Sequence, residues 1–247
     1  MNEECIEMID IEDFGLAEPG KLRAGINLGN VLLVTGATET GNPFGVSPAI
    51  AAALARNLGF SVSYWTYPSP GAVADAADQE DWDICLIAED PKRAETIEFC
   101  GAYAEIEATY MVPAGSKLTS LEDVDKPGVR IAVSDRSAYD LYLSRVLKHA
   151  ELKRAPGLTA AFELFRDQKL EALAGLRPAL LENAATLPGS RVMGGAYMAV
   201  RQAIGVRPGN PAFAKAVKRF VAEAKSNGLI DGLINEFGQR GRLSVAS

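Results

Sequence analysis

Hydrophobic and polar positions along the first 110 residues predict an alternation of strands and helices. Apolar or alternating runs rich in β-branched residues predict strands, whereas apolar residues at three- and four-residue spacing predict helices. Ser47, followed by Pro48, predicts the start of the first helix, and Gly59 predicts its end. The predicted elements are strands at 22–29, 60–67 and 83–88, helices at 49–58 and 71–79, and a turn-rich hairpin or loop at 36–45. This β-α-β-α-β order is typical of a doubly wound sheet.

The same pattern begins again at Val129 and predicts a second set of elements. Strands at 130–133, 151–156 and 170–176 alternate with helices at 138–150, 159–167 and 180–185, and a long amphipathic helix follows at 212–227. One extended segment near Tyr110 leads into this second set, and another near Val200 leads out of it. We therefore expect an α/β protein of two lobes, each with a doubly wound sheet, joined by a two-strand hinge. The expected boundaries are 1–109 with 201–247 for lobe 1 and 110–200 for lobe 2.

Two places in this pattern are candidates for a binding cleft between the lobes. The stretch from Arg130 to Leu143 predicts a strand, a polar turn ending at Ser137, and a helix, and the N-terminus of a helix is suited to an anion. Glu89, Asp90 and Arg93 follow the buried strand at 83–88. Ligands of open α/β sheets bind outside the carboxyl ends of the strands, so these residues are expected at the same cleft.

Composition and charge exclude several classes of function. The 247 residues are 48% hydrophobic, with a net charge of -7, no basic patch and 7% aromatic residues, so we expect no nucleic-acid partner. The longest apolar runs are too short to span a bilayer, so we expect no membrane insertion. The polar residues 1–19 are expected to form a loose arm or one helical turn ending at Pro19. The N-terminus shows neither the basic nor the apolar region of a secretory signal.

The reactive residue types give no sign of a metal site, a cofactor or a nucleophile. Three cysteines, Cys5, Cys85 and Cys100, provide no disulfide framework, and Cys85 lies in an apolar run that predicts burial. His149 is the single histidine and is expected at a solvated helix end, so a metal site is not expected. The chain contains no GxxxxGK[ST] phosphate loop and no evident Ser–His–Asp or Cys–His set. We expect no cofactor.

Several strings, in this order and spacing, resemble the family 3 extracellular solute-binding proteins. They are GKLRAGINLGN, GNPFGVSPAIAAALARNLGF, EDWDICLIAEDPKRAETIEFCGAY, DVDKPGVRIAVSDRSAYDLYL and FVAEAKSNGLIDGLINEFG, which together span residues 20–240. The resemblance implies the type II periplasmic-binding-protein fold and a binding protein, not an enzyme. It also implies a monomer that closes on a small carboxylate-bearing solute, amino-acid-like or an organic anion, and serves the permease of an ABC importer. The location implied is the periplasm, or the cytoplasm if Met1 is the native start.

The resemblance also implies ligand-binding roles for individual positions. Arg93, in a D-P-K-R stretch, corresponds to the arginine that grips the ligand carboxylate, which an arginine fork suits well. Ala88 falls in the backbone segment that meets the ligand. Ser137 and Ala138 fall where the second lobe offers a hydroxyl and backbone N–H groups, and Asn30 falls where a lobe-1 residue covers the ligand. The alternatives are a surface ion pair for Arg93, a helix cap for Ser137 and a turn for Asn30.

Four further residues are candidates for the same cleft. Glu89 and Asp90 lie between the buried strand and Arg93. Tyr103 is a candidate wall of the cleft, with packing in the core as its alternative. Arg177 directly precedes Pro178, which favours a turn or extended chain at a strand end.

One departure from the family pattern concerns the ligand's charge. The family's amino-acid binders place an acidic residue near the end of this strand to hold the ligand ammonium, but here the position falls at Leu176 or Arg177. Arg177 could instead pair with a second anionic group. We therefore favour a carboxylate-bearing or doubly anionic ligand over an α-amino acid, although Glu89, Asp90 or Glu107 could supply a replacement anion.

Two other functions are compatible with the same sequence. Cyclohexadienyl dehydratases share this fold, and such an enzyme would need a general acid, for which Glu89 and Glu107 are the candidates. A cytoplasmic ligand sensor or scavenger would fit the free cysteines and the N-terminus without an export signal.

Overall fold

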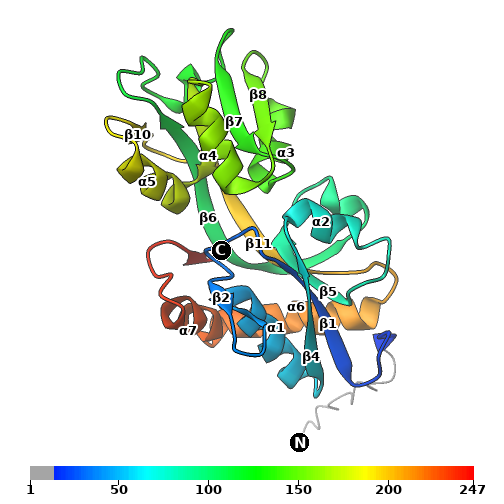
Figure 1. Cartoon of the computed structure of the whole chain (residues 1–247). Coiled ribbons are helices and arrows are strands. Elements are labelled where there is room, and N and C mark those ends of the chain that lie inside the picture. The colour runs from blue at the N-terminus through cyan, green and yellow to red at the C-terminus, as the bar shows by residue number, and fades with distance from the viewer. Residues whose placement is uncertain (1–13) are drawn as a thin grey trace, which may run out of the picture.

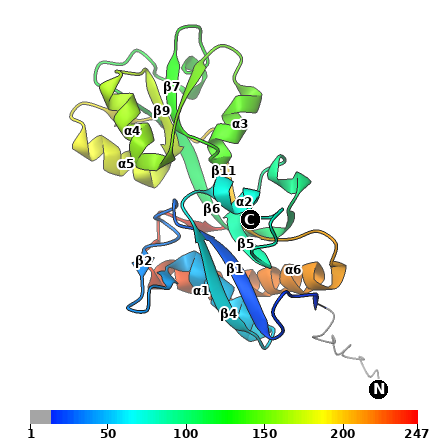
Figure 2. The same cartoon turned by 45° about the vertical axis from the view of Figure 1, so that its right-hand side comes forward.

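The computed structural model describes residues 14–247 and shows two lobes connected by a pair of long strands (Figure 1). The predicted N-terminal arm up to residue 13, including Cys5, lies outside the described residues. The long strands are β6 (Glu98–Val112) and β11 (Met198–Val206). They carry one mixed sheet through both lobes, in the order β4-β1-β5-β11-β6-β9-β7-β8. The turned view in Figure 2 shows the same separation of the lobes, with β6 and β11 between them.

Lobe 1 is built on the parallel strands β4, β1 and β5, with helices on both faces. The elements are β1 (Lys21–Asn27), α1 (Val46–Asn57), β4 (Ser61–Tyr67), α2 (Pro70–Asp75), β5 (Ile84–Ala88), α6 (Pro211–Ser226) and α7 (Leu229–Glu236), with a small hairpin of β2 (Gly36–Ala37) and β3 (Pro43–Phe44). Successive side chains of β5 point to opposite faces. Ile84 and Leu86 therefore pack with α1 and α6, whereas Cys85 and Ile87 pack with Val73 of α2. Cys85 is fully buried, which confirms the prediction from its apolar run.

Lobe 2 repeats this arrangement around the parallel strands β9, β7 and β8. The elements are β7 (Arg130–Ser134), α3 (Ala138–Val146), β8 (Glu151–Ala155), α4 (Gly157–Asp167), β9 (Ala172–Leu176), α5 (Arg177–Thr186) and the short β10 (Arg191–Val192). Phe165 of α4 and Leu180 of α5 pack with Ala132 on one face of β7. Ile131 points to the other face and packs in the same cluster as Leu143 of α3.

The two crossover strands join the lobes and pair with strands of both. β11 pairs with β5, β6 pairs with β9, and the two strands pair antiparallel with each other. Their register shifts between Gln202 and Ala203, close to the middle of β11. The C-terminal β12 (Ser244–Val245) also pairs with β6. The two expected sheets are therefore continuous through the hinge, and the lobe boundaries near residues 110 and 200 stay a prediction.

The first helix begins earlier than its sequence predicts. α1 starts at Val46, preceded by Gly45 at φ +144°, and Ser47 makes no helix cap. A Cβ at position 45 would collide with the backbone carbonyl of Leu33, so only glycine fits there. The Ser47 hydroxyl instead forms a buried hydrogen bond of 2.8 Å with the Tyr103 hydroxyl. The Ser47 hydroxyl, which was expected to cap the helix, is thus used in a contact with a distant part of the chain.

The helix predicted at 138–150 ends earlier, at Val146. The carboxylate of Asp125 accepts hydrogen bonds from the backbone N–H groups of Lys148, His149 and Ala150, at 2.8 to 3.1 Å. Because these N–H groups are bonded to a side chain, they do not continue the helix. His149 is exposed just beyond the helix.

Candidate functional site

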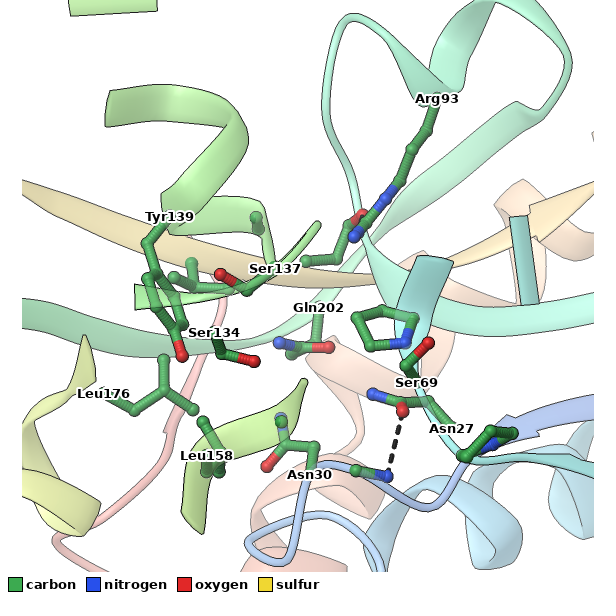
Figure 3. A pocket seen from close by; sticks show the side chains of 17 residues that line it. Asn27, Asn30, Ser69, Arg93, Ser134, Ser137, Tyr139, Leu158, Leu176 and Gln202 are labelled. Carbon is green, nitrogen blue, oxygen red and sulfur yellow. Dashed lines mark hydrogen bonds between the residues drawn. The ribbon is translucent and has the colours of Figure 1, made fainter. Parts of the chain in front are cut away.

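A cavity lies where the two lobes meet, at the carboxyl ends of several strands (Figure 3). Seventeen residues from both lobes and the hinge line it: Asn27, Gly29, Asn30, Pro68, Ser69, Pro70, Ala88, Arg93, Ser134, Ser137, Ala138, Tyr139, Gly157, Leu158, Leu176, Val200 and Gln202. The carboxyl-end position agrees with the general rule for ligand crevices in open α/β sheets. Arg93 is the single charged side chain in this lining.

On the lobe-1 side, three polar side chains are held by the chain's own backbone. Asn27, the last residue of β1, accepts the N–H of Gly29 on its Oδ1 at 2.9 Å. Asn30 accepts the N–H of Leu32 on its Oδ1 at 3.2 Å. Ser69 caps α2 by accepting the N–H of Ala72 on its Oγ at 3.2 Å. Such local bonds are typical of Asn and Ser in turns and caps, and they fix the side chains beside the cavity.

On the lobe-2 side, the ends of β7 and β9 and the start of α3 face the cavity. Ser134 ends β7, and Ser137 caps α3 by accepting the N–H of Asp140 on its Oγ at 3.1 Å. The first N–H groups of a helix have no acceptor within the helix, so the start of α3 offers donors beside the cavity. Leu176, the last residue of β9, adds an apolar wall.

Arg93 is buried at the junction of the lobes, with only 4% of its surface exposed. Its Nη1 donates to the carbonyl of Ala88 at 2.6 Å, and its Nη2 donates to the carbonyl of Arg136 in lobe 2 at 2.9 Å. Within residues 14–247, no carboxylate forms an ion pair with it. Burial lowers the pKa of Arg93 to about 10, opposed by the charge of Asp90. The guanidinium therefore remains protonated at neutral pH.

Tyr139 brings a second buried polar group to the cavity. Its ring belongs to the first turn of α3, and its hydroxyl points toward the space between Ser134 and Leu176 (Figure 3). Within the described residues this hydroxyl has no hydrogen-bond partner. Burial raises the pKa of Tyr139 to about 12. The nearby hydroxyls of Ser137 and Ser134 lower this pKa, although neither is placed to form a hydrogen bond with the Tyr139 hydroxyl. The hydroxyl therefore stays neutral and can either donate or accept.

Five of the nine residues proposed from the sequence come together here. Asn30, Ala88, Arg93, Ser137 and Ala138 all line the cavity. Ser137 is also a helix cap, which confirms that interpretation, while its contact with a ligand stays a prediction. Sequence reasoning missed most of the remaining lining. Asn27 ends β1 and Ser134 ends β7, whereas the predicted strands run to residues 29 and 133, so the strand-end rule points only to their neighbourhood. Gln202 lies within a crossover strand and gave no signal.

The other four candidates lie outside the cavity lining, and each has a different partner. Glu89 pairs with Arg201 at 2.6 Å, and Asp90 pairs with Arg145 at 2.7 Å. Tyr103 is fully buried in the core, where it bonds to Ser47. Arg177 pairs with Glu107 at 2.5 Å and donates to the carbonyl of Met193 at 3.1 Å.

Two arginines of lobe 2 form ion pairs with lobe 1 beside the cleft. Arg136 donates to both oxygens of Asp75, at the end of α2, at 2.6 and 2.8 Å. Arg145 of α3 donates to both oxygens of Asp90, at 2.7 and 3.2 Å. The Arg136 hydrogen bond holds the pKa of Asp75 below its ordinary value. These contacts, with the Arg93 bond, show that the structure has the lobes closed on each other.

Two further features are absent from the described part of the chain, a metal-binding cluster and a membrane-spanning helix. No group of three His, Cys, Asp or Glu side chains in residues 14–247 could hold a metal ion. No helix in the same range is long and apolar enough to cross a membrane.

Two lobes that enclose a cavity beside a two-strand hinge define the type II periplasmic-binding-protein architecture. Residues 31–240 match the model of the bacterial extracellular solute-binding proteins, family 3, and the chain belongs to that family. A comparison with curated proteins found no match.

Solved structures of amino-acid-binding proteins share the fold. A binding component of an ABC transporter from Wolinella succinogenes, complexed with lysine, has a TM-score of 0.75 at 19% identity, covering 89% of this chain and 96% of that one. AbpA of Streptococcus pneumoniae, bound to L-arginine, has a TM-score of 0.72 at 16% identity, covering 88% and 94%. The ancestral amino acid-binding protein AncCDT-1, described as a precursor of cyclohexadienyl dehydratase, has a TM-score of 0.73 at 21% identity, covering 88% and 95%. At these identities the likeness concerns the fold alone.

Proposed function

We propose that this protein closes its two lobes on a small solute that carries a carboxylate. Family membership supports solute binding, and the environment of Arg93 supports the carboxylate. A buried guanidinium without an ion-pair partner is costly, and the charge of nearby Asp90, which is itself paired with Arg145, offsets its desolvation only in part. A ligand carboxylate in the cavity would supply that charge and would accept two parallel N–H bonds.

Closure follows from the position of Arg93 between the lobes. A carboxylate held by Arg93 of lobe 1 would also face Ser137 and the start of α3 in lobe 2. A ligand that contacts both lobes binds the closed state more tightly than the open state and shifts the population toward closure. In this proposal, β6 and β11 are the hinge.

We propose further that the protein is the substrate-binding component of an ABC importer and works outside the cytoplasmic membrane. The family description, extracellular solute-binding, supports this location. The likeness to transporter components from Wolinella and Streptococcus supports the importer role. Uptake of the identified ligand by cells with and without the gene tests this part: uptake that does not depend on the gene would contradict it.

Binding is favoured over dehydratase catalysis by the placement of the acidic residues. Glu89 and Glu107, the candidate general acids, are paired with Arg201 and Arg177. Within the described residues, no Asp or Glu lines the cavity. A general acid must come within hydrogen-bond reach of the leaving group. Incubation of the purified protein with prephenate should therefore give no phenylpyruvate, and measurable turnover would reverse this preference.

A thermal-shift screen with calorimetry tests solute binding directly. The purified protein is heated with a panel of small carboxylates, the corresponding amides and neutral sugars. A ligand present at about 100 times its Kd stabilises the folded state by about 2.7 kcal/mol, so a true ligand raises the Tm clearly. We expect at least one carboxylate to raise the Tm, and we expect the corresponding amide to leave the Tm unchanged. If no carboxylate in the panel does so, the proposal is wrong.

A further inference from the structure

We propose that the cavity selects a small monocarboxylate whose remaining part is uncharged and carries a hydrogen-bond acceptor, as in 2-oxo and 2-hydroxy acids, and that it discriminates against α-amino acids. This inference rests on the proposed function, because it specifies the ligand of the same site. Three observations carry it: the direction of the free hydrogen-bonding groups, the residue at the end of β9, and the placement of Arg177.

The lobe-1 wall offers mainly donors to a ligand. Asn27 and Asn30 each accept a backbone N–H on the side-chain oxygen, and because a backbone N–H can only donate, the NH₂ end is the one left over. Ser69 also accepts a backbone N–H, which leaves its O–H to donate. The carbonyl of Ala88 already accepts from Arg93. On this side and on β11, where Gln202 lies, a ligand ammonium meets neutral acceptors only, because no described residue of the lining is a carboxylate.

The lobe-2 wall has no charge to balance an ammonium. Leu176 occupies the end of β9 with 4% of its surface exposed, and Leu158 is beside it in the cavity lining (Figure 3). Among residues 14–247, no carboxylate lines the cavity. The groups left on this wall are neutral hydroxyls, of which the Tyr139 hydroxyl is buried and without a partner in the described residues. A neutral oxygen of the ligand can satisfy that hydroxyl.

A second anionic group on the ligand has no counterpart either. Arg177 could have received one, but its side chain pairs with Glu107 and bonds to the carbonyls of Met193 and Gly195. Arg93 is left as the single cation of the cavity lining. One buried cation balances one carboxylate, so dicarboxylates are expected to bind weakly.

The test compares ligands that share a carbon skeleton. Calorimetric Kd values are measured for two triplets, leucine with 2-hydroxy-4-methylpentanoate and 4-methyl-2-oxopentanoate, and alanine with lactate and pyruvate, together with 2-oxoglutarate. In at least one triplet, the oxo or hydroxy acid should bind about 100-fold more tightly than the amino acid, because an unpaired buried charge is strongly unfavourable. An amino acid that binds as tightly as its analogues, or 2-oxoglutarate binding more tightly than every monocarboxylate, overturns the inference and leaves the proposed function intact. Absence of binding by every one of these compounds overturns the inference, and the proposed function falls with it when the carboxylate panel of the thermal-shift screen also gives no ligand.

A variant at position 176 tests the cause of the selectivity. Leu176→Asp should shift the ratio of amino-acid to oxo-acid affinity by about 10-fold or more toward the amino acid. The control is Leu176→Asn, in which the side chain has the shape of aspartate without its charge, and it should leave the ratio within about twofold of wild type. A purely structural role for Leu176 would weaken all ligands alike and would not change this ratio. An unchanged ratio in a folded Leu176→Asp protein overturns the assignment. If that variant does not fold, the wild-type triplets decide.

Discussion

The guanidinium of Arg93 in lobe 1 donates a hydrogen bond of 2.9 Å to the backbone carbonyl of Arg136 in lobe 2. The side chain of Arg136 returns across the cleft and holds the carboxylate of Asp75. Both arginines thus connect the two lobes. Arg93 does so from the cavity lining, and Arg136 does so from beside the cleft. In the proposed function, closure of the lobes and formation of the ligand site would therefore depend on the same few contacts.

Removing the charge of Asp75 should favour the open state. In Asp75→Asn, the ion pair with Arg136 is lost, and an exposed pair of this kind contributes up to about 1 kcal/mol, or about fivefold in Kd. We expect a larger radius of gyration by X-ray scattering without ligand and a ligand Kd raised by no more than about fivefold. Asp231→Asn, which breaks the exposed pair with Arg240 inside lobe 1, is the control and should change neither value. Identical scattering for Asp75→Asn and wild type would contradict a role in closure.

The contribution of Asp75 to closure should depend on pH in the acidic range only. Its pKa in the closed state lies below the ordinary value, chiefly because Arg136 donates to it. A carboxylate with a depressed pKa contributes fully above its ordinary value of about 4, and this contribution is lost as the pH falls through the depressed pKa. Scattering from the ligand-free protein should therefore stay constant from neutral pH to about pH 5 and show opening below about pH 4, with circular dichroism confirming that the chain is still folded. Asp75→Asn should lack this step, and a step at neutral pH would point to another group.

Tyr103 should matter for stability and not for binding. Tyr103→Phe leaves the buried Ser47 hydroxyl without its partner, which costs about 1–3 kcal/mol of unfolding free energy. Tyr64→Phe is the comparison, because the Tyr64 hydroxyl is only half-buried and should cost less. Urea unfolding measures both variants, and calorimetry should give an unchanged ligand Kd for Tyr103→Phe. A large loss of affinity without loss of stability would return Tyr103 to the ligand site.

Glycine at position 205 makes room for the packing of β11 on the lobe-1 core. A Cβ there would collide with Ile97 and would lie 2.9 Å from the Sγ of Cys85. Gly205→Ala should therefore lower the unfolding free energy by about 1–3 kcal/mol. Gly232→Ala in α7, where a Cβ meets nothing within 4 Å, should raise it by about 0.5–1 kcal/mol because alanine favours a helix. Equal effects of the two changes in thermal unfolding would contradict the packing described for Gly205.

Most of the architecture was predictable because its signals are local. The apolar run of β5 and the amphipathic spacing of the helix predicted at 212–227 are patterns within the element itself, and the structure has both elements, the helix as α6. The errors arose where a distant group intervened. Ser47 was expected to cap a helix but bonds to Tyr103, 56 positions away, and Asp125 takes the N–H groups that would have extended α3. No local pattern contains such contacts.

The candidate site was predictable to the extent that it lies at strand ends and helix starts. Ala88 and Ser137 follow that rule and line the cavity. The rule does not say which of two neighbouring side chains faces inward. At the end of β9, Leu176 faces the cavity, whereas Arg177, expected in a turn or extended chain, is the first residue of α5 and turns to Glu107. The position of Gln202 depends on the crossover strand as a whole, and nothing near it in the sequence indicates a ligand.

The most direct test of the central claim is the affinity of Arg93→Ala for the carboxylate identified in the screen. Calorimetry compares it with wild type and with Arg219→Ala, which removes an exposed arginine on α6. Losing one partner of a buried ion pair costs about 2 kcal/mol or more, so Arg93→Ala should bind at least about 30-fold more weakly, while Arg219→Ala binds as wild type. Wild-type affinity in a folded Arg93→Ala protein would contradict the account of this cavity as a carboxylate site.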